Sequence, residues 1–453
     1  MRSESQLHRV PEPSHAYLDA LNRQTEQRKS AAQHQLADSP GAPEDLVDAI
    51  EEAVDQQGQQ LVELLHDLHA HPELAYQEHH AAQQLVAHLE SHGISAESPV
   101  FGLETAIRAE IAAPDFDPET DRTVAILSEY DALPEIGHGC GHNVIAVTGL
   151  GAFTALVQLL REQPDRFRGR VVYLGTPAEE GHGGKEVMAR AGAFDDVDAA
   201  VMTHPYFADA ADVHWLGRRG CRVEFTGLAA HASAHPFLGR NALDAASLAY
   251  QGLGLLRQQT PPTDRIHGVL PQGGERPNVI PESAVLELYV RSQLPETLKV
   301  LSDRVDEVMQ GAALMAGVGV RIHWDESPAT LPVLGNRALS DRWVLAQRRR
   351  GREPLPAGTI SEVFAASTDF GNVSYRIPGI HPMLGISAED VGLHTREFAH
   401  AAASPAAERA AADGAFGLAA AAMDYLHDDG LAADVRQEFE TDGGGVDVAS
   451  YFD

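Results

Sequence analysis

The chain has 453 residues, 43% of them hydrophobic, which is long enough for two or three domains that each have a core. Its formal charge is -32, and only three of its 34 basic residues are lysines, so we expect an acidic surface that repels nucleic acid. We find no apolar run long enough to span a bilayer and no hydrophobic signal at the N-terminus, so we expect a soluble, cytoplasmic protein that binds no membrane.

Two further features of the composition bear on the environment of the protein. Only two cysteines occur, Cys140 and Cys221, so we expect no disulfide framework, and a thiolate remains free to bind a metal. The large negative charge together with the scarcity of lysine favours adaptation to a salt-rich cytoplasm, because concentrated salt screens self-repulsion. An ordinary acidic protein is the alternative interpretation.

The N-terminal half predicts a polar extension followed by an α/β domain. Residues 1–42 are polar and form the extension, and two amphipathic helices separated around His71 to Leu74 come next. Strands alternating with helices then indicate a mostly parallel sheet with helices on both faces, built from residues 43–212 and 330–427. The histidines of the first two helices fall near polar faces and are predicted to be solvated or structural; these are His66, His69, His71, His79 and His80.

Potential ligands follow three of the predicted strands. The strand that ends at Ser128 leads into EYDALPEIGHGCGHN, which carries Glu129, Asp131, Cys140 and His142. The strand GRVVYLGT leads into PAEEGHGG with Glu179 and Glu180, and a third strand ends at His204. In parallel sheets ligands bind beyond the carboxyl ends of the strands, so we expect these side chains to lie together.

Cys140 and His142 are separated by one glycine. In an extended backbone, residues i and i+2 point to the same side, so this pair can bind one metal ion; the alternative is a tight turn with a stray histidine. Adjacent glutamates at a strand end project in different directions, so one of Glu179 and Glu180 can bind metal while the other faces substrate. The alternative for these glutamates is a solvated pair.

The remainder of the chain predicts an inserted domain and a return to the first one. Residues 213–329 show a β-α-β-β-α-β pattern, which describes a two-layer α/β domain of ferredoxin-like order. Within 330–427 we expect a helix near 338–350, a loop STDFGNVS that either caps a helix or contacts substrate, a strand near 381–386 and a helix over 399–427. Residues 428–453 hold eight acidic residues against one arginine, so we expect a solvated acidic tail.

Seven motifs in this order resemble one known family. EYDALPEIGHGCGHN, GTPAEEGHGG, THP, GLAAHASAHPFLGRNALDA, RPNVIPE, STDFGNVS and HTREF are similar to those of the metal-dependent amidohydrolases and dipeptidases that include aminoacylase, the indole-acetyl-amino-acid hydrolases and aminobenzoyl-glutamate hydrolase. The resemblance is closest to the branch of aminobenzoyl-glutamate hydrolase and β-alanyl-lysine (Xaa-Arg) dipeptidase. It implies a zinc-peptidase-like catalytic domain and an inserted dimerisation domain.

The resemblance also implies roles for individual residues. Cys140 would bridge two divalent ions, Mn or Zn, with Glu179 as general base and Asp131 behind the ligands. The remaining metal ligands would be His142, Glu180, His204 and His394. Where relatives with an aspartate bridge have a metal-binding histidine, this chain has Glu129, which leaves the filling of both metal positions open.

The inserted domain would contribute further residues. In relatives it forms a homodimer and lends a histidine across the interface, which here corresponds to His231, with Asn278 and Arg291 as substrate contacts. Taken alone, His231 could be an ordinary core or surface histidine, Asn278 could cap a turn, and Arg291 could pair with Glu287.

These observations predict a metal-dependent hydrolase that cleaves an amide or peptide bond of a dipeptide or N-acyl amino acid next to a free carboxylate, through water and the Glu179 base. Two alternatives stay open. One is a non-catalytic binder of amino-acid conjugates, and the other is a hydrolase that uses Cys140 as its nucleophile.

The charge of the chain predicts that its stability depends on salt. Dialysis from molar to millimolar KCl should lower the melting temperature or unfold the protein, because the negative charges are then no longer screened. Circular dichroism followed through the dialysis measures this. Equal melting temperatures at both salt concentrations would contradict the interpretation as a salt-adapted protein.

Overall fold

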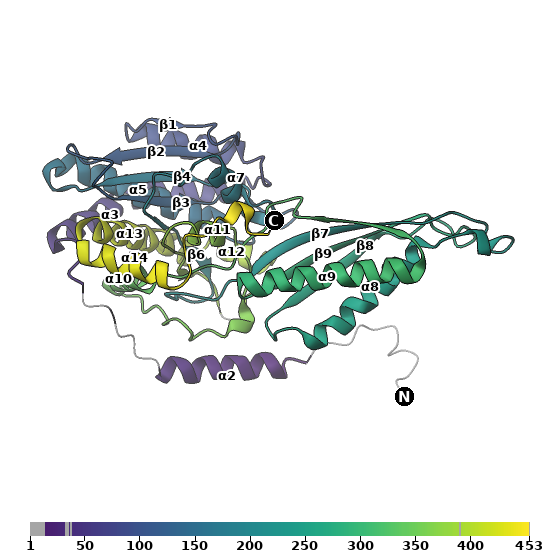
Figure 1. Ribbon diagram of the computed structural model, residues 1–453. Coiled ribbons are helices and arrows are strands. Elements are labelled where there is room, and N and C mark those ends of the chain that lie inside the picture. Colours follow the sequence, from purple (N-terminus) through teal and green to yellow (C-terminus); the bar gives the residue numbers. More distant parts are fainter. Residues whose placement is uncertain (1–13, 32–35, 37–38, 389–390, 453) are drawn as a thin grey trace.

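The computed structural model describes residues 14–31, 36, 39–388 and 391–452. It consists of a large α/β domain and an elongated second domain that extends from one side of it (Figure 1). The helix α2 (Ala16–Ala31) lies in the predicted N-terminal extension; the rest of residues 1–38, except residues 14, 15 and 36, is outside the described part.

A six-stranded sheet forms the centre of the large domain, in the order β1-β2-β4-β3-β5-β11. Four neighbouring strands, β4, β3, β5 and β11, run parallel, while β1 and β2 are antiparallel to their neighbours at one edge. The strands are β1 (Ala96–Glu97), β2 (Ile107–Ala112), β3 (Thr123–Ser128), β4 (Arg170–Gly175), β5 (Ala199–Val201) and β11 (Gly379–Ile380). A separate short pair, β6 (His204–Tyr206) and β12 (Met383–Gly385), continues beyond the sheet.

The central strands are buried on both faces, which explains their continuous apolar sequence. On β3, Val124 and Ile126 join the core formed with the first set of helices, whereas Ala125 and Leu127 join the core on the opposite face. The first face is covered by α3 (Glu44–Ala70), α4 (His79–Ser91), α5 (His142–Glu162), α10 (Arg337–Arg349) and α13 (Pro405–His427), and the second by α7 (Gly184–Arg190) and α11 (Phe370–Ser374). The predicted mostly parallel sheet with helices on both faces is confirmed.

The inserted domain has the predicted β-α-β-β-α-β order. Its antiparallel sheet is ordered β10-β7-β9-β8, the arrangement of a ferredoxin-like fold, and two helices cover one face of it. The elements are β7 (Gly217–Thr226), α8 (Ala242–Leu256), β8 (Arg265–Gln272), β9 (Ser283–Ser292), α9 (Pro295–Ala316) and β10 (Gly319–Trp324). The other face is open: on β9, Leu286, Leu288 and Val290 are buried under the helices while Glu287 and Tyr289 are exposed.

The prediction of a solvated acidic tail over residues 428–453 is wrong. These residues contain α14 (Asp429–Thr441), whose Leu431 and Val435 are buried against the large domain. Further along, Phe452 packs on the core of the inserted domain. The acidic side chains dominate the composition, but apolar residues at helical spacing give this helix a buried face.

Two smaller expectations also need correction. The helix predicted over residues 399–427 is two helices, α12 (Arg396–Ala401) and α13, because Ser404 caps a new helix whose first residue is Pro405.

The helix α5 is long and apolar enough to cross a bilayer, contrary to the expectation that the chain has no such segment. It is a core helix here, with 89% of its most apolar window buried.

A buried lysine joins two elements that flank the carboxyl end of the sheet. The ammonium group of Lys185, on α7, donates to Glu129, just after β3, and to Asp369 Oδ1 at 2.6 Å, just before α11. The backbone N–H of Lys185 also donates to Asp369, at 2.9 Å. Lys185 is fully buried, so these two carboxylates are the groups that compensate its charge.

Replacing this lysine by methionine should destabilise the protein strongly. Lys185→Met leaves two buried carboxylates without their cation, which costs about 3–5 kcal/mol for a broken buried ion pair. Denaturant unfolding of the variant against wild type measures the loss. Lys29→Met is the matched control, because half of the Lys29 side chain is exposed and its pairing with Glu26 is a surface contact. Equal unfolding midpoints for the two variants would contradict the role of Lys185.

Candidate metal centre and active-site cavity

The loop after β3 delivers Cys140 and His142 to the carboxyl end of the sheet. Gly141 between them has φ +79°, and a Cβ there would lie 2.5 Å from a side-chain carbon of Pro205, so only glycine fits. His142 is the first residue of α5. The two side chains converge as predicted, but through a left-handed turn at a helix start rather than through an extended backbone.

The glutamate pair lies in α6 (Glu179–His182), an irregular turn after β4. Ala178 before it has φ +61°, and its N–H donates to buried Glu78 at 2.9 Å. The N–H of Glu180 donates to Asp131 Oδ2, also at 2.9 Å. Carboxylates from two other segments therefore fix the backbone that aims Glu179 and Glu180 into the site.

Asp131 supports the ligands from behind, as the resemblance implies. Its Oδ1 accepts a hydrogen bond from Nδ1 of His142 at 2.8 Å, which fixes the tautomer and directs Nε2 into the site. Its other oxygen holds the backbone of Glu180. One buried carboxylate thus orients a ligand on α5 and a ligand on α6.

Two further histidines complete the group. Nδ1 of His204 donates to the carbonyl of Pro205 at 2.7 Å, so its Nε2 faces Cys140 Sγ at 3.4 Å. The N–H of His394 donates to the carbonyl of Gly139, and its Nε2 lies 3.3 Å from Oε1 of Glu180. All five metal ligands predicted from the resemblance are therefore in one place: Cys140, His142, Glu180, His204 and His394.

The donor set fits divalent cations. Ligand atoms of Cys140, His142 and His204 lie within 4.8 Å of one another, and so do those of Cys140, Glu180 and His394. Nε2 of His142 and Oε1 of Glu180 are buried and make no hydrogen bond within the described part of the chain. Buried polar atoms without a partner are costly, and thiolate, imidazole and carboxylate ligands suit Zn or Mn. The two groups share Cys140, the residue that would bridge two ions according to the resemblance.

Burial and neighbouring charges shift the pKa values of the side chains in this site. Burial and the charge of Glu180 raise the pKa of Cys140 well above its usual value, and burial with Glu129 and Glu180 does the same for Glu179. Burial and His142 lower the pKa of His204 to about 4. A divalent ion favours the thiolate, the carboxylates and neutral imidazole together, which is the state in which all of them are ligands.

A cavity of about 730 Å³ opens from these ligands toward the inserted domain. Arg291 lines it and donates to Ser367 Oγ at 2.7 Å, so the predicted substrate contact lies beside the site. Glu287, its suggested ion-pair partner, instead binds Arg222. Ser367 and Asp369 of the STDFGNVS segment line the cavity, and Asp369 precedes α11 without a side-chain capping hydrogen bond; contact of this segment with substrate stays a prediction.

The sequence alone did not reveal several residues around the cavity. Lys185 was missed as the shared partner of Glu129 and Asp369, and Arg218 and Tyr289 were missed as cavity residues. The rarity of lysine was a usable signal for Lys185, because a residue type that occurs only three times in the chain suggests a specific role. Arg218 lies in an arginine-rich strand and had no such signal.

His231 and Asn278 are remote from the metal ligands of their own chain. They lie together in the loops beyond β7 and between β8 and β9, where the N–H of Ala232 donates to the carbonyl of Asn278. Figure 1 shows these loops at the end of the inserted domain that points away from the large domain. Neither residue lines the cavity, and both are exposed.

A second cluster lies among the histidines of the first two helices, outside the cavity. Asp67 Oδ2 lies 2.7 Å from Nε2 of His80, and Asp67 Oδ1 lies 3.3 Å from Nδ1 of His71. His66 contacts Glu408, and His69 contacts the carbonyl of Ala399. These partners agree with the prediction that the histidines are solvated or structural.

Comparisons with known proteins agree with the site. The family model described as peptidase family M20/M25/M40 matches residues 125–422. Mouse Xaa-Arg dipeptidase is 38% identical over 86% of this chain and 91% of its own length. One of the chains that make up p-aminobenzoyl-glutamate hydrolase of Escherichia coli is 28% identical over 86% of this chain and 94% of its own.

Solved structures share the fold. An aminobenzoyl-glutamate utilization protein from Klebsiella pneumoniae superimposes with a TM-score of 0.63 at 20% identity, covering 83% of this chain and 99% of its own. A Bacillus subtilis dinuclear metal binding peptidase of the M20 family gives 0.60 at 21% identity, covering 80% and 99%. The chain belongs to peptidase family M20/M25/M40 and is a metal-dependent hydrolase of peptide or amide bonds.

Proposed function

We propose that the protein hydrolyses dipeptides or N-acyl amino acids at the amide bond beside a free carboxylate, with two divalent ions, Mn or Zn. The observation that carries this is the convergence of five ligand side chains with Glu179 at one end of a cavity that also contains Arg291. When bound, the ions supply Lewis-acid polarisation of the amide carbonyl and lower the pKa of water.

Glu179 is placed to move the proton. Its Oε2 lies 4.0 Å from Nε2 of His142, so it reaches the space between the ligands, while 11% of its side chain remains exposed to the cavity. As general base it takes a proton from the attacking water and delivers it to the leaving amine. Arg291 holds the substrate carboxylate by its guanidinium fork and so orients the scissile bond.

The oxyanion that develops on the substrate needs a hydrogen-bond donor, and we assign this role to His231 of a second copy of the chain. The N–H groups of Ser233 and Ala234 both donate to Nδ1 of His231, at 3.2 and 3.1 Å. The ring proton is therefore on Nε2, which is free to donate. Since His231 and Asn278 cannot reach their own cavity, the proposal requires a homodimer through the inserted domain.

The nucleophilic-cysteine alternative has no support in this geometry. Cys140 is 7% exposed and its thiol pKa is raised, and the imidazole beside it, His204, is a weak base because its pKa is lowered to about 4. A panel of dipeptides and N-acyl amino acids, assayed with and without chelator, separates the three possibilities. Activity abolished by chelator supports the proposal, chelator-resistant and alkylation-sensitive activity supports a cysteine nucleophile, and binding without turnover supports a binder.

The proposed location of the protein is a salt-rich cytoplasm.

Removing the general base should separate metal binding from turnover. Glu179→Ala should keep its metal content and lose turnover by several orders of magnitude, because the ligands remain while proton transfer is lost. Metal analysis of the purified variant beside steady-state kinetics measures both. Glu180→Ala is the matched comparison and should lose metal. If the metal contents are reversed, the two glutamates have exchanged roles.

The partner's role of His231 should be visible by mixing two inactive variants. Glu179→Ala and His231→Ala dimers, dissociated and reassociated together, should recover about a quarter of wild-type activity, because half of the dimers are mixed and one of their two sites is complete. Each variant reassociated alone is the control and stays inactive. If mixing restores nothing although mixed dimers form, His231 does not act across the interface.

A further inference from the structure

Two arginines face each other where the inserted domain closes the cavity. Arg218 on β7 and Arg291 on β9 are direct cross-strand partners, and both line the cavity that contains Cys140, Glu179 and His204. Side chains at such positions have Cβ atoms about 5 Å apart, and like charges there oppose folding. The two guanidinium groups are thus held together against their mutual repulsion.

Neither of these arginines forms an ion pair with a carboxylate of the described residues. Arg218 is 6% exposed, lies 4.9 Å over the ring of Tyr289 and donates a long hydrogen bond, 3.4 Å, to the carbonyl of Gly181. Arg291 donates to the hydroxyl of Ser367. Burial and the charge of Arg218 also lower the pKa of Arg291.

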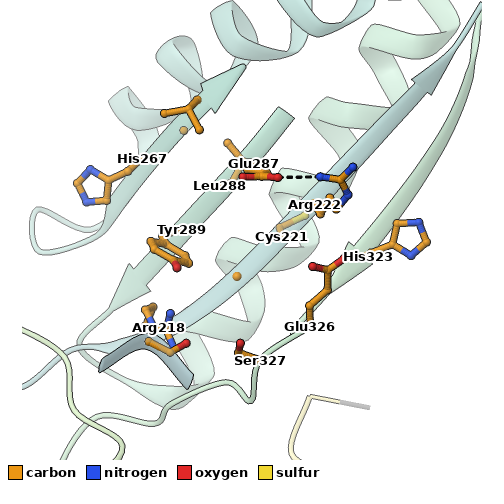
Figure 2. Close-up of a pocket in the computed structure, with 14 residues that line it drawn as sticks. Arg218, Cys221, Arg222, His267, Glu287, Leu288, Tyr289, His323, Glu326 and Ser327 are labelled. Atoms are coloured by element: carbon orange, nitrogen blue, oxygen red, sulfur yellow. Dashed lines mark hydrogen bonds and ion pairs between the residues drawn. The ribbon is translucent and has the colours of Figure 1, made fainter. Parts of the chain in front are cut away.

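The neighbouring arginines of the same strand behave differently. Arg219 binds Asp325 and Arg222 binds Glu287, at 2.7 Å in both cases. Figure 2 shows the Arg222–Glu287 pair on the open sheet face, with Arg218 and Tyr289 further along the same sheet. Arg218 and Tyr289 also line the catalytic cavity, whereas Arg222 and Glu287 do not. In a chain with 66 acidic residues, a buried arginine and a half-buried arginine that both lack a carboxylate partner among the described residues indicate a binding site for an anion from outside the chain.

This inference rests on the proposed amide hydrolysis and concerns its substrate class. We propose that Arg218 is a specificity-determining residue that, together with Arg291, selects substrates whose amine half is an acidic amino acid. Arg291 binds the carboxylate next to the scissile bond, and Arg218 binds the side-chain carboxylate. Two guanidinium forks match two carboxylates in number and geometry, whereas a basic side chain here would add a third positive charge.

The test compares substrates that differ only in this charge. With one acyl group held constant, kcat/KM is measured for the conjugates of glutamate, glutamine and lysine. Glutamine is isosteric with glutamate and lacks the charge, so wild type should favour glutamate over glutamine by at least about tenfold, the size expected for a charge-assisted hydrogen-bond pair. The lysine conjugate should be the poorest of the three.

Variants test whether the preference for glutamate over glutamine depends on Arg218. Arg218→Met should lower kcat/KM for the glutamate conjugate about tenfold more than for the glutamine conjugate, whereas Arg291→Met should lower both together. Arg222→Met, on the same strand and face but paired with Glu287, is the matched control and should keep the wild-type ratio. Arg218→Lys keeps the charge without the fork and should give an intermediate ratio, which decides the question if the methionine variant does not fold.

Each contrary result has a distinct meaning. Preference for the lysine conjugate, or an unchanged glutamate to glutamine ratio in Arg218→Met, overturns the substrate class. An unchanged ratio in which kcat/KM falls equally for both conjugates would mean that Arg218 binds only the carboxylate that they share. If metal-loaded wild type turns over no conjugate, the proposed hydrolysis fails instead, and calorimetric binding of the glutamate and glutamine conjugates to wild type and Arg218→Met still tests the arginine.

Discussion

Five carboxylates crowd the carboxyl end of one sheet, and the rest of the site depends on how their charge is compensated. Glu129, Asp131, Glu179, Glu180 and Asp369 come from three separate segments, and three of them, Glu129, Glu179 and Asp369, lie within 4.8 Å of one another. Such packing in a water-poor interior is unfavourable unless cations neutralise it. Lys185 is a buried cation that binds two of these carboxylates, Glu129 and Asp369, and metal ions would neutralise further charge. Fold and metal binding are therefore linked through the same carboxylates.

The geometry of the site is set mainly by groups that do not bind metal. Asp131 fixes the ring of His142 and the backbone of Glu180, and the carbonyl of Pro205 fixes the ring of His204. Gly141 allows the thiol and the first imidazole to converge by its left-handed conformation. Because partners hold the rings of His142 and His204 and the backbone of Glu180, the ions would meet a largely preorganised site rather than gather flexible side chains.

The two ends of the inserted domain carry different candidate site residues. The near end brings Arg218 and Arg291 to the cavity, whereas the far end carries His231 and Asn278 away from it. The cavity of one chain thus contains Glu179, Arg218 and Arg291 but not His231, the donor that we assign to the oxyanion. In the proposed symmetric dimer, the far end of each inserted domain would supply this histidine to the cavity of the other copy.

Much of this protein follows from the sequence alone. Alternating strands and helices predicted the parallel sheet, and period-two patterning predicted the inserted domain. The motifs predicted five candidate ligands, Glu179 and Arg291, and the structure brings these side chains to one site. The sequence could not show which acidic segment is buried, so α14 was taken for a solvated tail although Leu431 and Val435 give it an apolar face. It also could not show the pairing of distant charges, because Lys185, Glu129 and Asp369 are up to 240 positions apart and meet only after the sheet has formed. Arg218 and Arg291 are 73 positions apart, and only the register between β7 and β9 makes them neighbours. Local pattern determines elements and motifs, whereas the partners of buried charges are decided by tertiary packing.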